Sequence, residues 1–270
     1  MHDPLGTLTD VPWHTLHHAR GNAVDVPDRL RAMRSPNRST REDGRARLMA
    51  LVTHEGSRWS VSAVLVPFLV ALVDDVDTAD REDVVGLLHA IALGDTSLPF
   101  EVDFSAGEAL SADELATAAR PDAPADLAEA AALRWAAAAY RAAADRVDSY
   151  VRWLSDPLVA AQAAELLAYF PPTPDVVDAL VASVAPASAN LTLAHLTGYP
   201  KVDAHLTTAL DSTALDVRMT AAVALAFRLG PDLPSEALDV LVDATPPPAP
   251  PGWDRSMRGF VTLALRRVGL

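Results

Sequence analysis

The chain has 270 residues, of which 50% are apolar and 6% aromatic, and its formal net charge at pH 7 is −14. Half of the residues can form a core, which excludes a mainly disordered chain. The negative charge disfavours nucleic acid as a partner, because binding to a phosphate backbone depends on Lys and Arg. The lack of cysteine excludes disulfides and thiol chemistry.

The N-terminus has no basic region followed by an apolar stretch, so we expect no signal peptide. The longest apolar run, residues 61–73, contains Pro67. It is shorter than the roughly 20 residues that a membrane-spanning helix needs. We therefore expect a cytoplasmic protein that has no membrane partner.

Apolar residues recur at spacings of three and four along the chain, which predicts an all-α fold. Ser39 with Glu42, and Ser111 with Glu114, fit the capping box that begins a helix. The stretch from Gly94 to Gly107 reads as a loop. In the first half, helices are predicted over residues 27–34, 41–52, 59–73, 79–93 and 112–119, and over 125–154 as one long helix or two fused ones.

The second half contains a recurring two-helix unit. One copy runs from Val202 to Gly230, with helices over 202–210 and 214–229. Such a unit cannot bury its apolar faces alone and must stack on its neighbours. Further helices are predicted over residues 158–169, 174–184, 187–196, 235–243 and 254–268. We expect one solenoid of antiparallel helix pairs, with irregular pairs over 1–107, a connecting region over 108–154 and a regular array over 155–270.

Residues 216–225, Asp-Val-Arg-Met-Thr-Ala-Ala-Val-Ala-Leu, resemble a HEAT repeat, and residues 156–167 form a weaker copy in which Gln162 replaces the usual arginine. The resemblance implies an α/α superhelix with a concave face. It also implies that Asp216 and Arg218 tie one turn to the next repeat. The likeness says little about activity, because helical repeats serve many functions.

The N-terminal third is similar to a narrower bacterial (actinobacterial-type) group of HEAT-repeat proteins of unassigned function. The likeness lies in Trp13, in residues 18–27 and 54–57, and in the Val-Pro-Phe-Leu of residues 66–69. The group more often has Tyr and Gln where this chain has Arg20 and Glu55. If these positions form a site, its charge has changed in this chain.

Histidines, aromatics and charged residues gather near the N-terminus. Histidine acts as an acid or base near neutral pH, and a carboxylate can orient it. His54 and Glu55 are therefore the catalytic candidates, although a polar cap on the end of the repeats would explain the same cluster. The binding candidates are Trp13, His17, His18, Arg58, Trp59, Trp135 and Tyr140. Only His17, His54 and Glu55 could converge on a metal and no spacing demands it, so we expect neither metal nor cofactor.

Two charged stretches have competing interpretations. The arginines of residues 29–47 suit a solvated helix face that offsets the acidic remainder, or a docking patch for an acidic partner. The aspartates of residues 74–80 suit a turn with a helix cap, or less well a magnesium site, since Thr78 stands where the last ligand is needed.

The sequence favours a binding or scaffold protein that engages a protein or ligand partner through a concave face, with the acidic charge favouring a basic partner surface. The alternative is an enzyme acting on a hydrophobic small molecule, for example in natural-product biosynthesis. In that case His54 and Glu55 would act as acid and base, and they and Trp59 would meet Trp135 or Tyr140 across a closed pocket. Whether the chain is an enzyme stays open at this point.

Overall fold

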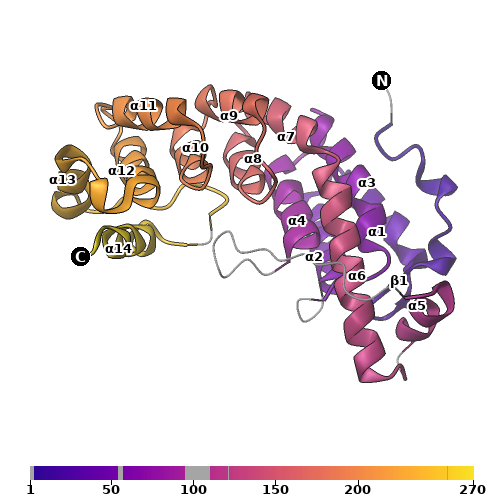
Figure 1. Ribbon diagram of the computed structural model, residues 1–270. Coiled ribbons are helices and arrows are strands. Elements are labelled where there is room, and N and C mark those ends of the chain that lie inside the picture. The colour runs from indigo at the N-terminus through magenta and orange to yellow at the C-terminus, as the bar shows by residue number, and fades with distance from the viewer. Residues whose placement is uncertain (1–2, 54–56, 95–109, 121, 254) are drawn as a thin grey trace. The chain divides into compact units, whose positions relative to one another are not determined.

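The computed structural model describes residues 3–53, 57–94, 110–120, 122–253 and 255–270 (Figure 1). Regular structure in these ranges is almost entirely helical, which confirms the all-α prediction. The exceptions are two short strands, β1 (His17–His18) and β2 (Gly21–Asn22), which pair antiparallel with His17 opposite Asn22. Among the described helices, none combines the length and the apolar character that crossing a bilayer requires.

The chain divides into two compact units, Met1–Val147 and Asp148–Leu270. The division into regions 1–107, 108–154 and 155–270 stays a prediction.

The N-terminal unit centres on α3, which packs against both α4 and α6. Fully buried leucines of α3 and α4, among them Leu65, Leu69 and Leu88, form its core. The indole of Trp13 fixes the N-terminal segment by donating from Nε1 to the carbonyl oxygen of Leu8 at 2.7 Å. The elements of this unit are η1 (Leu8–Asp10), η2 (Trp13–Thr15), η3 (Ala23–Asp25), α1 (Val26–Ala32), α2 (Arg38–Val52), α3 (Ser62–Asp74), α4 (Arg81–Leu93), α5 (Ala112–Ala118) and α6 (Ala125–Ala144).

Of the two predicted capping boxes, the structure contains the one at the start of α5 and not the one at the start of α2. Ser111 and Glu114 make the predicted box at the start of α5. The Ser39 box is wrong, because α2 begins earlier and the side chain of Asn37 accepts the amide hydrogen of Thr40. Glu42 instead pairs with Arg38 at 2.8 Å. The predicted helix over 125–154 is two helices, α6 and α7.

The C-terminal unit is built from two layers of helices (Figure 1). Helix α10 contacts α8 on one side and α12 on the other, and α12 contacts α14. Helices α9 and α11 contact each other and pack on α10 and α12 respectively. The elements are α7 (Val147–Trp153), α8 (Ala160–Leu167), α9 (Pro174–Val181), α10 (Pro186–Leu193), α11 (Pro200–Ala209), α12 (Leu215–Leu229), η5 (Gly230–Asp232), α13 (Ser235–Asp243) and α14 (Met257–Val268).

Polar side chains of α10 tie it to both neighbours. Ser188 and Thr192 donate to carbonyl oxygens of α8, those of Ala161 and Ala164. On the other side, the Asn190 amide donates at 3.2 Å to the Thr220 hydroxyl and to a backbone carbonyl of α12. Buried polar groups need such partners, and these bonds therefore fix where α10 lies between α8 and α12.

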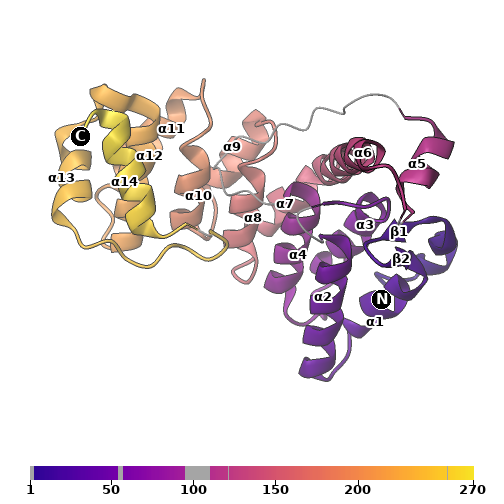
Figure 2. The same ribbon diagram turned by 90° about the horizontal axis from the view of Figure 1, so that it is seen from below.

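A proline-rich strap, residues 246–253, connects α13 to α14 and returns to α8 and α10 (Figure 2). The indole Nε1 of Trp253 donates to the Ser188 hydroxyl at 2.7 Å. Gly252 has φ +92°, and a Cβ there would lie 3.1 Å from the Cα of Gln162, so glycine is required by both conformation and space. With the strap in place, every residue from Ala187 to Ala194 is buried.

Candidate ligand-binding pocket

A pocket of about 540 Å³ lies in the N-terminal unit, where the β1–β2 turn meets α1 and α2. The amide of Ala19, in the turn, donates to the carbonyl oxygen of Leu51 at 3.0 Å and so holds the turn against the end of α2. The volume is in the range of small-molecule sites. The lining residues are His18, Arg20, Asn22, Val24, Asp25, Arg29, Ala46, Arg47, Ala50 and Leu51.

The pocket lining includes a contact between a buried histidine, His18, and the carboxylate of Asp25. His18 is 5% exposed, and its Nε2 lies 2.9 Å from Oδ1 of Asp25. Its Nδ1 accepts the backbone amide hydrogen of Arg20 at 3.1 Å. Because Nδ1 is an acceptor, the ring proton lies on Nε2 and is donated to Asp25. The pair fixes the turn that carries Arg20.

Three arginines surround this pair. The Nε of Arg29 lies 3.7 Å from Oδ2 of Asp25, and within the described residues this buried nitrogen has no hydrogen-bond partner. Arg47 pairs with Asp43 at 2.7 Å, and both side chains are more than half exposed. Arg20 is exposed and has no ion-pair partner in the described part of the chain. The lining is therefore net cationic in a strongly acidic chain.

Trp13 and His17 are not among the residues that line this pocket. The Trp13 ring is buried against Phe68 with ring centroids 6.0 Å apart, which makes it a core residue. The backbone amide of His17 donates to the Ser60 hydroxyl at 2.8 Å, which joins β1 to the segment before α3. His54 and Glu55, the catalytic candidates, lie outside the described residues.

Two of the predicted residues from distant segments do meet. Trp59 and Trp135 stack with ring centroids 5.9 Å apart and 24° between their planes. Trp135 belongs to a buried cluster with Ala118, Ala119 and Ala131, against which Trp59 packs. The contact is therefore part of the packing between α6, the end of α5 and the segment before α3.

Burial shifts the pKa values of two further binding candidates, Arg58 and Tyr140. Burial lowers the pKa of Arg58, whose guanidinium lies so close to Gly94 that a Cβ there would collide with it. Tyr140 is half-buried, and burial raises the pKa of its phenol. The predicted loop over 94–107 lies outside the described residues except for Gly94, which ends α4.

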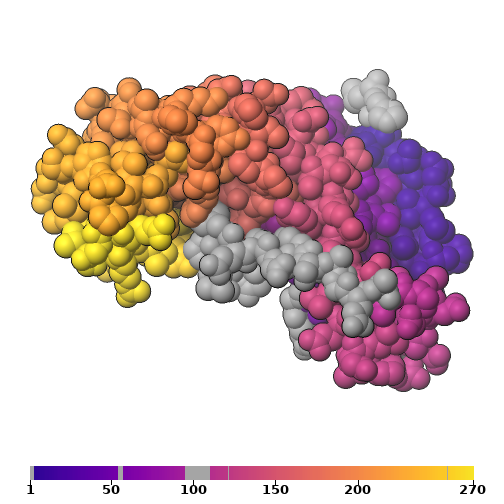
Figure 3. Space-filling model, in the orientation of Figure 1, coloured from indigo at the N-terminus to yellow at the C-terminus, as the bar shows by residue number. Residues whose placement is uncertain are grey.

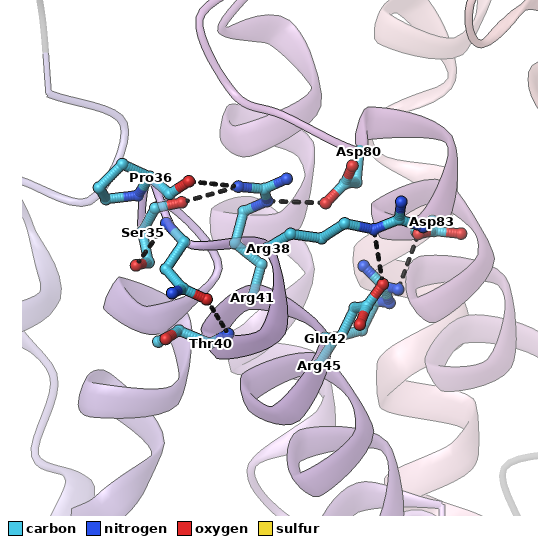
Figure 4. A network of polar contacts seen from close by, with 10 residues as sticks. Ser35, Pro36, Arg38, Thr40, Arg41, Glu42, Arg45, Asp80 and Asp83 are labelled. Carbon is cyan, nitrogen blue, oxygen red and sulfur yellow. Dashed lines mark hydrogen bonds and ion pairs between the residues drawn. The ribbon is translucent and has the colours of Figure 1, made fainter.

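Some arginines of the basic stretch pair with carboxylates in or just after the acidic run (Figure 4). Arg41 and Arg45 of α2 reach Asp80 and Asp83 at the start of α4, each at 2.7 Å. Arg34 likewise pairs with Asp75 at 2.7 Å. Arg41 and Arg45 therefore connect α2 to α4, whereas Arg38 and Arg47 pair within α2. Within the described ranges, no group of three or more His, Asp or Glu side chains is placed to hold a metal ion.

Sequence reasoning missed most of the pocket. It singled out His18 and noted the altered charge at Arg20, but it did not propose Asn22 and Asp25, and it considered Arg29 and Arg47 only as part of a docking patch for an acidic partner. A partial signal was present, because Ala46 with Ala50, and Arg47 with Leu51, are four residues apart and share a face of α2.

Comparisons with known proteins find no match for this chain among family models, curated proteins or solved structures.

Proposed function

We propose that the chain is a helical-repeat binding protein of HEAT-like architecture that engages a protein partner. The observation that carries this proposal is the order of packing in the C-terminal unit. Helices α8, α10, α12 and α14 contact one another in chain order, while α9 and α11 form a second layer. Stacked helix pairs of this kind give extended surfaces that suit binding.

The accessible surface of this unit favours a basic partner. Residues 187–194 of α10 and its C-terminal end, and 219–226 of α12, are buried throughout, so these stretches offer no free face. Helices α9, α11 and α13 lie on the outside, and in Figure 3 the C-terminal helices form a continuous surface on the face shown. Exposed carboxylates on α9 and α13 are those of Asp175, Asp178, Glu236, Asp239 and Asp243. Opposite charge on a partner would steer association and fix its orientation.

The test reverses charge on α13. Proteins captured by the full chain from lysate are identified, purified and titrated against wild-type protein and against the double variant Glu236→Lys/Asp239→Lys. The matched control is Asp126→Lys/Glu129→Lys, a pair of exposed carboxylates with the same spacing on α6. We expect a purified basic partner whose affinity falls at least tenfold, about 1.4 kcal/mol, with the α13 variant only. Equal loss with both variants, or no purified partner that binds, would contradict the proposal.

A second candidate function is conversion of a hydrophobic small molecule. The contact between Trp59 and Trp135 brings together two residues that this hypothesis names, although as a buried stack and not across a pocket. The test is incubation of the protein with a metabolite extract, followed by mass spectrometry. Catalysis would change a metabolite with time, and the change would be lost in His54→Ala and Glu55→Gln but kept in the exposed His14→Ala control.

A further inference from the structure

We propose that the pocket beside the β1–β2 turn binds a small organic carboxylate with an apolar body. This site is independent of the proposed protein-binding surface, because all of its lining residues lie in the N-terminal unit.

The charge of the lining selects an anion. Arg20, Arg29 and Arg47 contribute three positive charges, and among the described lining residues Asp25 alone contributes a negative one. That carboxylate is already engaged, with Oδ1 at 2.9 Å from His18 and Oδ2 at 3.7 Å from Arg29. The rest of the positive charge faces a pocket in a chain whose net charge is −14.

The donors for a carboxylate are already held in place. The guanidinium of Arg29 lines the pocket beside Asp25, and because its Nε is enclosed while the side chain is 30% exposed, a ligand carboxylate meets its terminal nitrogens. Arg20 stands on a turn that is fixed through its own backbone amide and His18. A planar guanidinium matches a carboxylate in a two-bond geometry, and charge-assisted bonds of this type are about twice as strong as neutral ones.

Arg47 can also bind the ligand carboxylate, because little stability is lost when it leaves Asp43. Its ion pair with Asp43 joins residues one helical turn apart, and both side chains are more than half exposed. Exposed pairs of this kind contribute little to stability. A ligand carboxylate can therefore compete with Asp43 for the Arg47 guanidinium.

Part of the pocket is apolar. Ala46, Ala50 and Leu51 line it from α2, and Val24 lines it from the segment after β2. Val24 is 61% exposed, an unusual position for a large apolar side chain next to a pocket. Covering these groups with a hydrocarbon gains roughly 25 cal/mol for each Å² of apolar surface removed from water. The pocket thus suits a molecule with one charged end, and the acidic chain repels polyanions.

The probe is octanoate, titrated calorimetrically into the full chain, with 1-octanol, octylammonium and inorganic phosphate as comparisons. We expect saturable 1:1 binding of octanoate, at least tenfold weaker binding of octanol, and no binding of octylammonium. Absence of octanoate binding would overturn the proposal, and so would equal affinity for octanol. Phosphate competing as well as octanoate would show a general anion site and would overturn the apolar half of the inference.

Variants locate the site. Arg29→Gln and Arg20→Gln should each weaken octanoate binding about tenfold, because each removes a charged hydrogen-bond donor. The matched control is Arg31→Gln, which lies on the same helix but pairs with Asp28 outside the pocket. Equal weakening by Arg31→Gln would mean that only the overall charge matters, which contradicts a site at this place.

A second pair of variants tests occupancy of the pocket without removing an arginine. Ala50→Glu places a carboxylate inside the pocket and should abolish octanoate binding, whereas Thr40→Glu adds the same charge at an exposed position of α2 outside it. Thermal unfolding of each variant checks that it is folded. Unchanged binding by a folded Ala50→Glu variant would overturn the assignment.

Discussion

Trp59 and Trp135 stack 5.9 Å apart, between the segment that precedes α3 and the middle of α6. The pair covers the alanines at the end of α5, so a single aromatic contact joins three parts of the N-terminal unit. Stacked aromatic pairs contribute about 0.5–1.5 kcal/mol beyond the burial of their area.

Trp135→Ala should lower the free energy of unfolding by about 3 kcal/mol, because it removes a buried aromatic side chain and leaves a cavity. Trp135→Phe keeps most of the volume and should cost about 1 kcal/mol. Denaturant titration measures both changes, and circular dichroism should show the loss of the coupled indole signal in each variant. A cost below about 1 kcal/mol for the alanine variant would contradict the packing role.

Arg228 joins α12 to the segment between α10 and α11. Its Nε lies 2.5 Å from the Asp203 carboxylate, and its other nitrogens donate to the carbonyl oxygens of Leu193, Leu196 and Tyr199. Arg228→Met should cost about 2 kcal/mol because several acceptors lose their donor. Arg228→Lys should recover less than half of this, since an ammonium cannot span the same acceptors. The exposed Arg258→Met variant is the control and should unfold like the wild type.

Asp80 begins α4 in the left-handed conformation, with φ +55°, while its carboxylate accepts a hydrogen bond from Arg41. The bond lowers the pKa of Asp80. Asp80→Asn keeps the conformation and loses the ion pair, whereas Asp80→Ala also strains the backbone by about 1 kcal/mol. Melting temperatures should therefore fall in the order wild type, Asn variant, Ala variant.

The sign of the pH effect at Asp80 follows from its lowered pKa. The ion pair stabilises the folded state above the unfolded pKa of about 3.9, and the stabilisation disappears as pH falls through the lower folded pKa. The difference between wild type and Asp80→Asn should therefore be present at neutral pH and vanish in strong acid. A difference independent of pH would show that charge is not its source.

Burial lowers the pKa of His195 to about 3. In the unfolded chain His195 is protonated below pH ~6.5, whereas in the folded chain it stays neutral until about pH 3. Acidification therefore favours unfolding. Stability should fall by up to about 1.4 kcal/mol per pH unit in this window on account of this residue. His195→Leu should flatten the dependence between pH 6 and about 5, where most carboxylates remain ionised. An unchanged slope in the variant would contradict the assignment.

Trp253 and Ser188 should be energetically coupled. Trp253→Phe keeps an aromatic ring beside Phe260 but removes the Nε1 donor to the hydroxyl together with part of the ring. We expect a cost of about 1 kcal/mol and a coupling of similar size with Ser188→Ala in a double-mutant cycle. Additive costs would show that the strap is held by other contacts.

Helix positions could be predicted from the sequence because their signals are local. The predicted helices over 202–210 and 214–229 correspond to α11 and α12 within two residues at each end. The resemblance to a HEAT repeat implied a tie between repeats at Asp216 and Arg218. Arg218 instead donates to the carbonyl oxygens of the turn just before its own helix. The longer connection is made by Arg228, whose backbone acceptors lie 29 to 35 residues earlier.

The pocket could not be predicted from the sequence, because it depends on contacts between segments that are distant along the chain. Its two sides lie on the β1–β2 turn and on α2, and only their packing brings Arg20 near Arg47. The pairing of Arg41 with Asp80 is equally non-local, because it depends on how α2 lies against α4. A periodic pattern shows that a face is buried or exposed, but it does not show which distant face lies opposite.

The strap has a consequence for the order of events during synthesis. Trp253 follows Ser188 by 65 residues, so a ribosome must add at least that length before α10 can receive its last hydrogen bond. Until then the nascent chain leaves part of this helix uncovered and open to unwanted association. The C-terminal unit is thus completed late in synthesis, when Trp253 binds to the earlier helix α10.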